Sequence, residues 1–396
     1  PVHKPKGVVF GETIVYDGER CIMCTRCIRV CDELAQDPVL DMRQRGNRNE
    51  IVLSPGRELD HDYSLMTEHV CPVGALTSSH FRFKARVWFL RTGRTICQGC
   101  ATGCNAYLDY DPRDNKPYRY RPRDNEEVNG YWMCDSGMLS YPEAHENRLL
   151  TARVGGDDAS LTEALGAAKR QFEGHGAEPG RVGVVLSARH SLEDNFALAW
   201  IAKRFLNVEQ VFISARADGR GDDILQSADH NSNRAGVAHA TGLVGLDAAR
   251  PLAELPEAIE KGGLQFVIAL GADADGIDAG VLKAALGKLK GYISIASHES
   301  PLSAVAHIAL PASSWAEARG TYINRKGMHQ RADAVLEPYG DAFPGWQLAI
   351  ALARALGYDV TWKNRGDLEQ AMLEASAPAK QDEGDVSDAP TDGAPS

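Results

Sequence analysis

The segment CIMCTRC, residues 21–27, places Cys21, Cys24 and Cys27 on one short stretch with two residues between successive cysteines. A fourth cysteine, Cys71, lies further along the chain and is followed by Pro72. Three thiolates on a tight loop bind three corners of a cubane [4Fe-4S] cluster, and a remote Cys-Pro closes the fourth corner. Zinc is the alternative, but zinc knuckles usually show two C-x2-C pairs and not a run of three. We therefore predict a [4Fe-4S] cluster on these four cysteines.

A neighbouring cysteine, Cys31, extends the run to C-x2-C-x2-C-x3-C. In two-cluster ferredoxins the cysteine at this position serves the other cluster and precedes a proline. Here Asp32 follows it, and Cys71 already supplies the fourth ligand. We therefore expect Cys31 to be a buried free cysteine.

A second set of cysteines begins with TICQGCATGC, residues 95–104. This segment contains Cys97, Cys100 and Cys104 in the spacing C-x2-C-x3-C. The fourth cysteine of the set, Cys134, lies further along the chain. Four thiolates again suit [4Fe-4S], and Gly99 and Gly103 would let the backbone approach the cluster without a Cβ in the way. A zinc ribbon is the alternative for this spacing. The sequence thus predicts a second cubane cluster.

The stretch between Cys104 and Cys134 has the pattern of a β-hairpin. Residues 105–110 and 118–123 alternate in polarity, and residues 112–116 are rich in Pro, Asp and Asn. The hairpin carries bases and tyrosines that could serve a zinc-stabilised nucleic-acid module, namely Arg113, Lys116, Tyr118, Arg119, Tyr120, Arg121 and Arg123. Acidic residues interrupt them, and 43 Lys plus Arg against 54 Asp plus Glu give the chain a net charge of −11. We expect an exposed hairpin or a subunit contact and no nucleic-acid partner.

Beyond residue 150 helical and strand patterns alternate. Ser160 and Glu163 form a capping box that opens a helix to about residue 172, and a second helix is predicted over 192–206 and a third near 280–289. Buried strands are predicted at residues 181–187, 210–214, 265–270 and 291–296. Strands separated by helices indicate a mostly parallel sheet with helices on both faces. The sequence predicts an α+β iron-sulfur N-terminal region followed by an α/β domain.

Nucleotide-binding signals are weak in this α/β domain. GLVGLDAA, residues 242–249, lacks the G-x-G-x-x-G pattern. LGADADG, residues 270–276, follows a strand at the place where such sheets bind ligands, so we expect a vestigial pocket there. Two acids lie in this segment and a third follows it, and all are expected to be solvated loop residues: Asp273, Asp275 and Asp278.

The distribution of residue types divides the chain. All nine cysteines lie between Cys21 and Cys134, and no run of 18 apolar residues or signal-peptide pattern is present. We predict a ferredoxin-like region over 1–90, a small β-rich domain over 91–150, the α/β domain over 151–376 and a disordered acidic tail over 377–396.

Residues 8–150 resemble the large iron-sulfur subunit of bacterial NADH-quinone oxidoreductase, which is respiratory complex I. The similarity is carried by CIMCTRCIRVCDE (21–33), RQRGNRNEI (43–51), HVCPVGALTSSHFRFKARVW (69–88), TICQGCATGCN (95–105) and CDSG (134–137). The second half resembles a molybdopterin-oxidoreductase fold that has lost its cofactor, through LPASSWAEARGTYINRKGMHQR at 310–331.

The resemblance implies an electron-transfer subunit without catalytic residues of its own. In the family the first four cysteines hold a cluster of the main electron chain, and the second four hold an off-path cluster that only some bacterial members keep. The implied partners are the flavin and NADH-binding subunit and the downstream iron-sulfur subunits of the peripheral arm. The implied location is the cytoplasmic side of the inner (plasma) membrane, with membrane attachment only through partners.

One departure from the family concerns the N-terminal portion. The family carries a plant-type [2Fe-2S] domain and then a His-plus-three-Cys cluster, and neither has a counterpart before Cys21. We therefore expect either that the chain is a fragment or that another polypeptide supplies those clusters.

Two related assemblies remain as alternatives. A molybdenum-dependent formate dehydrogenase also places C-x2-C-x3-C ahead of this fold, and the diaphorase subunit of an NAD-linked hydrogenase shares the first set of cysteines. No cysteine follows Cys134 to ligate molybdenum, and CDSG lacks the basic residue that those dehydrogenases usually carry two positions after the last ligand. We therefore expect two [4Fe-4S] clusters and no molybdopterin. Arg26 and Arg29 would either favour the reduced first cluster or serve as surface charges.

Overall fold

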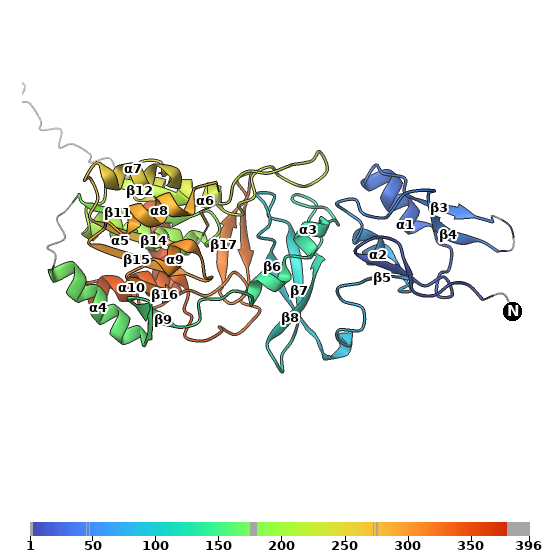
Figure 1. The fold of residues 1–396 in the computed structure, drawn as a ribbon, viewed down its shortest axis with the longest axis horizontal. Coiled ribbons are helices and arrows are strands. Elements are labelled where there is room, and N and C mark those ends of the chain that lie inside the picture. Colours follow the sequence, from blue (N-terminus) through green and yellow to red (C-terminus); the bar gives the residue numbers. More distant parts are fainter. Residues whose placement is uncertain are drawn as a thin grey trace, which may run out of the picture.

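The fold is seen in a computed structural model that describes residues 3–44, 46, 48–174, 180–271, 273–274 and 276–377. Three parts follow one another along the long axis of the molecule (Figure 1). The first carries Cys21 and Cys71, the middle part is a small sheet, and the third is a large α/β layer structure. The predicted tail lies outside the described residues except for Ala377, and so does Asp275. Within the described residues no helix has the length and apolar character needed to cross a bilayer.

Short elements make up the first part. β1 (Val8–Val9), β2 (Ile14–Tyr16) and β5 (Leu76–Ser78) form one antiparallel sheet, and β3 (Leu40–Arg43) pairs with β4 (Glu50–Leu53). The helical elements are α1 (Arg26–Arg29), its continuation as a short π-helix η1 (Val30–Leu34), and α2 (Met66–Val70). Alternation along β2 buries Ile14 and Tyr16, and Phe10 stacks on Tyr16 with ring centroids 4.7 Å apart. This core fixes the loops that carry the first cysteines.

The middle part is a three-stranded antiparallel sheet in the order β6 (Arg91–Ile96), β7 (Asn105–Asp111) and β8 (Lys116–Pro122). The predicted hairpin is β7–β8. The strand β6 was not predicted from the sequence. Because β6 pairs with β7, the cysteine loop 97–104 connects the two strands of a second hairpin. The Cys97 N–H donates to the Cys104 carbonyl at 2.8 Å. The short helices α3 (Asp135–Met138), η3 (Tyr141–Ala144) and η2 (Val87–Phe89) flank this sheet.

An eight-stranded sheet forms the centre of the third part. Its order is β10 (Asp157–Ala159), β9 (Ala152–Val154), β16 (Ile308–Pro311), β15 (Gly291–Ala296), β14 (Phe266–Leu270), β11 (Val182–Ser187), β12 (Gln210–Ser214) and β13 (Arg250–Pro251). The strands from β16 to β13 are parallel, and β9 and β10 add an antiparallel edge. The prediction of a mostly parallel sheet is confirmed.

Helices cover both faces of this sheet (Figure 1). One face packs α4 (Leu161–Gly174), α5 (Leu192–Phe205), α6 (Arg234–Leu243), α10 (Gly345–Ala355) and α11 (Arg365–Ser376). The other packs η4 (Leu252–Glu254), α7 (Leu255–Glu260), α8 (Ala279–Leu286) and α9 (Pro301–Ala304). Every residue of β11 is buried, since Val184 and Leu186 face the first set of helices and Val185 the second. Burial on both faces explains the unbroken apolar run.

The last hairpin, β17 (Gly320–Ile323) and β18 (His329–Ala332), lies between two parts: β18 contacts β6 of the middle part, and β17 contacts α5 and α6 of the third part. Trp315 stacks on Tyr120 of β8 with centroids 5.2 Å apart, and Val335 lies against Gly93, where a Cβ would come within 2.4 Å of its methyl group. Residues 315–336 thus complete the core of the middle part. Contacts therefore cross the boundary that the sequence placed at residue 150.

Candidate iron-sulfur sites

The first site is built from the loop before α1 and from the end of α2. Cys27 lies in α1, and Cys71 is the residue at which α2 ends. Met23 and Thr25 between the ligands have φ of 58° and 62°, a left-handed conformation that is strained for residues with a Cβ. The Met23 N–H donates to Cys21 Sγ at 3.4 Å. The loop is therefore held in an unusual shape around its cysteines.

The four thiols of the first site lie close enough to interact electrostatically. The pKa of the Cys27 thiol is raised to about 12, chiefly by burial, with the charges of Cys21, Cys71 and Cys24 contributing to the rise. A buried thiol with a raised pKa, such as that of Cys27, binds a proton or a metal in preference to staying as a free thiolate. The structure thus brings together the four predicted ligands, and this donor set fits an iron-sulfur cluster.

The second site is enclosed more deeply. Cys97, Cys104 and Cys134 are buried and Cys100 is half-buried. Burial, followed by the charges of the other three cysteines, raises the pKa of the Cys104 thiol well above its ordinary value. Backbone N–H groups point at the sulfurs: Gly99 donates to Cys97 Sγ and Gly137 donates to Cys134 Sγ, each at 3.4 Å. Such hydrogen bonds to sulfur are one way in which proteins set cluster potentials.

Gly137 is a site residue that the sequence analysis did not single out. A Cβ at this position would lie 3.2 Å from Cys97 Sγ and 3.3 Å from Cys134 Sγ. Of the two glycines predicted to approach the cluster, Gly99 does so, because its Cβ would lie 3.5 Å from Cys97 Sγ. Gly103 instead has a φ of 61° and faces Gln330. The available signal for Gly137 was its place in CDSG, three residues after Cys134.

The spacing of the thiols bears on the zinc alternative. Among the described residues, no three His, Cys, Asp or Glu side chains come close enough together to hold one metal ion. A zinc site needs its sulfurs about 2.3 Å from a single centre. A cubane is ligated at four separate irons, so its sulfurs stand farther apart. Metal content, and not this spacing, distinguishes the two kinds of site.

Cys31 lies outside the first set of ligands. It is fully buried, and burial raises the pKa of its thiol to about 12. Its nearest polar partner is His61, whose Nε2 lies 3.5 Å from Cys31 Sγ. The expected burial of this cysteine is confirmed.

The two sites differ in their access to solvent. At the first site Cys24 is exposed, and the neighbouring Ile22 retains 60% of its accessible surface. At the second site, residues of the third part cover the cysteine loop. The Ala101 N–H donates to the Asp229 carbonyl at 2.8 Å, and Thr102 Oγ1 donates to the Leu225 carbonyl at 2.6 Å. The first site is therefore open on one side at Cys24, whereas the second is more enclosed, with Cys100 half-buried and no cysteine exposed.

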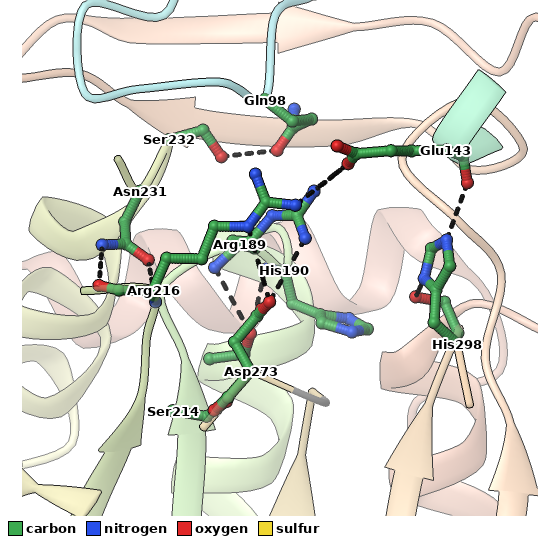
Figure 2. A network of polar contacts seen from close by, with 12 residues as sticks. Gln98, Glu143, Arg189, His190, Ser214, Arg216, Asn231, Ser232, Asp273 and His298 are labelled. Carbon is green, nitrogen blue, oxygen red and sulfur yellow. Dashed lines mark hydrogen bonds and ion pairs between the residues drawn. The ribbon is translucent and has the colours of Figure 1, made fainter. Parts of the chain in front are cut away.

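A network of charged residues lies beside the second site, where parallel strands end (Figure 2). Arg189 follows β11, Arg216 follows β12 and Asp273 follows β14. Glu143 accepts from Arg189 at 2.8 Å and from Arg216 at 3.0 Å, and Asp273 lies 3.3 Å from Arg189 and 3.6 Å from Arg216. The guanidinium charges lower the pKa of the Glu143 carboxyl against the opposing effect of its burial.

This network corrects one sequence expectation. Asp273 is not a solvated loop acid, because two arginines bind it. Asp278 has a structural role as well, since it caps α8 by accepting from the Val281 N–H at 2.8 Å. The spacing of residues along the chain did not indicate that Arg189 and Arg216 pair with Asp273.

The same region tests whether a molybdopterin fits. The cavity between Gln98, Arg189, Trp315 and Tyr322 measures about 30 Å³, far below the 300 Å³ or so of a typical cofactor pocket. A wider hollow of about 460 Å³ lies beside β12 and α6. Its two arginines, Arg216 and Arg234, are already paired with acids. The residues that face the second site do not fit a pterin cofactor.

Comparison with known proteins places these features in a family. Residues 11–77 match the family model of the ferredoxin-like domain of NADH-quinone oxidoreductase subunit 3, and residues 161–355 match molybdopterin oxidoreductase. The chain is therefore an iron-sulfur protein in which a ferredoxin-like region precedes a molybdopterin-oxidoreductase fold.

Sequence relatives define the chain more closely. It is 33% identical over 220 residues to the NADH-quinone oxidoreductase subunit designated G of Mycobacterium tuberculosis, an alignment that covers 53% of this chain and 27% of that protein. The Streptomyces coelicolor subunit of the same designation is 30% identical over 60% of this chain and 30% of its own length, and subunit 3 of Thermus thermophilus is 35% identical over 48% and 24%. The chain is a homologue of this subunit, and the match spans less than a third of each of these relatives.

Among solved structures, acetylene hydratase from Pelobacter acetylenicus aligns over 72% of both chains with a TM-score of 0.47 and 10% identity. That resemblance is too distant to bear on chemistry.

Proposed function

We propose that this chain is an electron-transfer subunit of NADH-quinone oxidoreductase that conducts electrons through [4Fe-4S] clusters from the NADH and flavin end toward quinone. The observation that carries the proposal is the proximity of Cys27 to Cys21, Cys24 and Cys71, whose charges act on its thiol, with Cys24 at the surface. A bound cluster would supply one-electron chemistry. The protein holds the sulfurs, donates hydrogen bonds to them and limits their contact with water.

The two clusters have different roles in this proposal. Electron transfer between subunits needs a cluster near the surface, and the first site has its exposed Cys24 there. The second site is enclosed between the middle and third parts by bonds such as Thr102 to Leu225. We therefore assign the first cluster to the main path and the second to a position beside it.

The partners and location follow from the same proposal. The flavin and NADH-binding subunit would supply electrons, downstream iron-sulfur subunits would receive them, and these partners would hold the chain at the cytoplasmic face of the membrane. Nucleic acid is not among the partners, because the hairpin arginines are already bound: Arg119 and Arg121 pair with Asp109 at 2.6 and 2.8 Å. Ion pairs that are made within the chain are not available to phosphates.

The direct test is metal analysis of the anaerobically purified protein with EPR after reduction. We expect about eight iron and eight sulfide per chain, without stoichiometric zinc or molybdenum. Two zinc without sulfide would contradict the cluster assignment. Stoichiometric molybdenum would identify the formate dehydrogenase alternative.

Single substitutions test the roles of the two sites. Cys24→Ala should abolish electron flow from NADH to quinone in the assembled complex, and Cys100→Ala should leave most of it. Cys31→Ala is the matched control, because it removes a buried thiol outside both sets and should preserve the iron content. Equal loss of activity in the first two variants, with assembly intact, would refute the off-path assignment.

A further inference from the structure

Residues 81–94, here called the basic-aromatic linker, join the first part of the chain to the middle sheet. Large apolar side chains stand out into solvent along it: Phe83 retains 84% of its accessible surface, Trp88 74%, Val87 56% and Phe89 48%. Scattered apolar residues are ordinary on a protein surface, but four within seven residues are not. Together with Lys84 and Arg86 between them, they make an exposed strip of apolar and basic side chains along the linker.

The linker also concentrates positive charge in an acidic chain. It contains five bases and no acid, whereas the whole chain carries a net charge of −11. Lys84, Arg86 and Arg91 are exposed, and within the described part of the chain none of them forms an ion pair with an acidic side chain. The nearby hairpin differs, because Arg113 pairs with Asp111 and Arg119 pairs with Asp109. The linker therefore offers charge that the fold leaves uncompensated.

Contacts with the hairpin fix the shape of the linker. The Arg119 guanidinium lies 4.3 Å from the centre of the Phe81 ring, and that of Arg113 lies 4.6 Å from the centre of the Phe89 ring. Phe83 has a φ of 60°, a left-handed conformation that is costly for an aromatic residue and directs the chain outward. A surface held in place before binding loses less entropy when a partner docks.

A cavity next to the linker leads to the first site. It measures about 370 Å³, and its walls include Phe81, Arg119, His80 and the predicted ligand Cys71. A side chain that entered this cavity from a docked protein would come close to the first cluster. The linker thus lies where a partner would have a route to the electron path.

We infer that the basic-aromatic linker is the docking surface for an acidic, partly apolar segment of a partner protein subunit. Trp, Phe and Arg are enriched at protein interfaces, and the strip combines all three with unpaired charge. A short acidic segment can contact the linker alone, whereas a membrane or a nucleic acid is an extended anionic surface that would also face the rest of a chain with a net charge of −11. This difference favours a protein. The inference rests on the proposed function only in that the partner belongs to the same complex.

Photocross-linking in the intact complex tests the partner class. The tagged full chain would carry p-benzoylphenylalanine in place of Phe83, with the same replacement at Phe343, which is 43% exposed on the third part, as a control. We expect a cross-link from position 83 to a peptide rich in Asp, Glu and apolar residues within a co-purified subunit. A cross-link to lipid or nucleic acid, or no cross-link above the Phe343 control, would overturn the inference.

Charge reversal tests the energetics. Lys84→Glu combined with Arg86→Glu should lower the fraction of the chain in the complex about tenfold or more at low ionic strength. The difference from the parent should shrink at higher ionic strength, because salt screens the exposed charges. Lys203→Glu, an exposed base on α5, should leave that fraction within about twofold of the parent. Unchanged assembly of the double variant would refute docking. The iron content and EPR spectrum of the same samples report separately on the electron-transfer function.

Discussion

At the scale of single residues, the second site depends on groups that never touch iron. Gly137 leaves room for two sulfurs, and its N–H donates to one of them. Arg148 and Glu317 form a fully buried pair with Nη2 and Oε2 2.7 Å apart, and Arg148 also donates to the Ala144 carbonyl at 2.9 Å. Buried pairs of this kind are costly to break singly. They tie the chain that follows Cys134 to the α/β fold.

Gly137→Ala should disturb the second cluster alone. The added methyl group would lie about 3.2 Å from Cys97 Sγ, closer than a carbon and a sulfur can pack without displacement. We expect loss or a changed EPR signal of the second cluster, with the signal of the first unchanged. Gly242→Ala, in a helix where nothing lies within 4 Å of the new Cβ, is the control. An unaltered second signal in Gly137→Ala would show that the sulfurs are not held as described.

His298 should make stability depend on pH. Burial lowers the pKa of this imidazole to about 4, with Arg148 and Arg189 adding to the effect and the Glu143 carbonyl opposing it. In the unfolded chain the pKa is about 6.5, so the unfolded state binds the proton more readily. This contribution is complete above about pH 6.5 and is lost as the pH falls toward 4, by up to about 3 kcal/mol.

Urea denaturation at several pH values measures this effect. His298→Gln keeps a donor for the Glu143 carbonyl, which His298 Nε2 meets at 2.7 Å, but cannot titrate. The variant should therefore lose less stability than the parent between pH 6.5 and 4. If the free energy of unfolding fell equally with pH in the two proteins, the pKa of His298 would not be lowered in the fold.

At the scale of elements, the hairpin β17–β18 supports the cysteine loop 97–104. Gln330 on β18 donates to the Gly103 carbonyl at 2.9 Å and accepts from the Asn105 side chain. Asn324 donates to the Thr102 carbonyl at 3.4 Å. The conformation of the loop thus depends on residues more than 200 positions away in the sequence.

Gln330→Ala should loosen this loop. It leaves the buried Gly103 carbonyl and Asn105 amide without partners, which costs about 1 to 3 kcal/mol of unfolding free energy. We expect lower thermal stability and faster iron loss from the second cluster. Arg331→Ala, on the exposed face of the same strand, is the matched control and should change little. Equal effects of the two substitutions would contradict a specific role for Gln330.

At the scale of the whole molecule, the two cysteine sites have unlike surroundings. The first lies in the small N-terminal part, where Cys24 is exposed, and the second lies where bonds join the middle and third parts. Figure 1 shows these parts in their order along the molecule. A further link joins the parts, since Tyr63 donates to Asp222 of the third part at 2.7 Å. The α/β fold therefore acts here as a scaffold that covers a cluster site.

Chelation kinetics should separate the two clusters. A soluble iron chelator under anaerobic conditions should remove iron from the exposed first site at least severalfold faster than from the more enclosed second site, because attack requires contact with solvent. EPR during the reaction would follow each signal. Thr102→Val removes a bond that covers the second loop and should narrow the difference. Faster loss from the second site would contradict the assigned exposures.

Much of the fold was predictable because its signals are local. The capping box was one such signal: the Glu163 N–H donates to Ser160 Oγ at 3.2 Å, and the Ser160 N–H donates to the Glu163 carboxylate at 2.9 Å. Apolar runs predicted β11, β12, β14 and β15 nearly to the residue. The strand β6 was not predicted because its mostly exposed start, RTGR at residues 91–94, contains no apolar run. Its pairing with β7 is visible only in the structure.

The sequence by itself determined which cysteines are predicted to bind iron, because cysteine spacing is a property of neighbouring residues and a run of closely spaced thiolates is typical of cluster ligands. Only the tertiary structure decided which cluster site is open and which is enclosed, since Leu225, Asp229 and Gln330 reach the second loop from distant elements. It also decided that Asp273 pairs with Arg189 and Arg216. Charge pairs and burial join residues that are remote along the chain, so spacing alone carries no record of them.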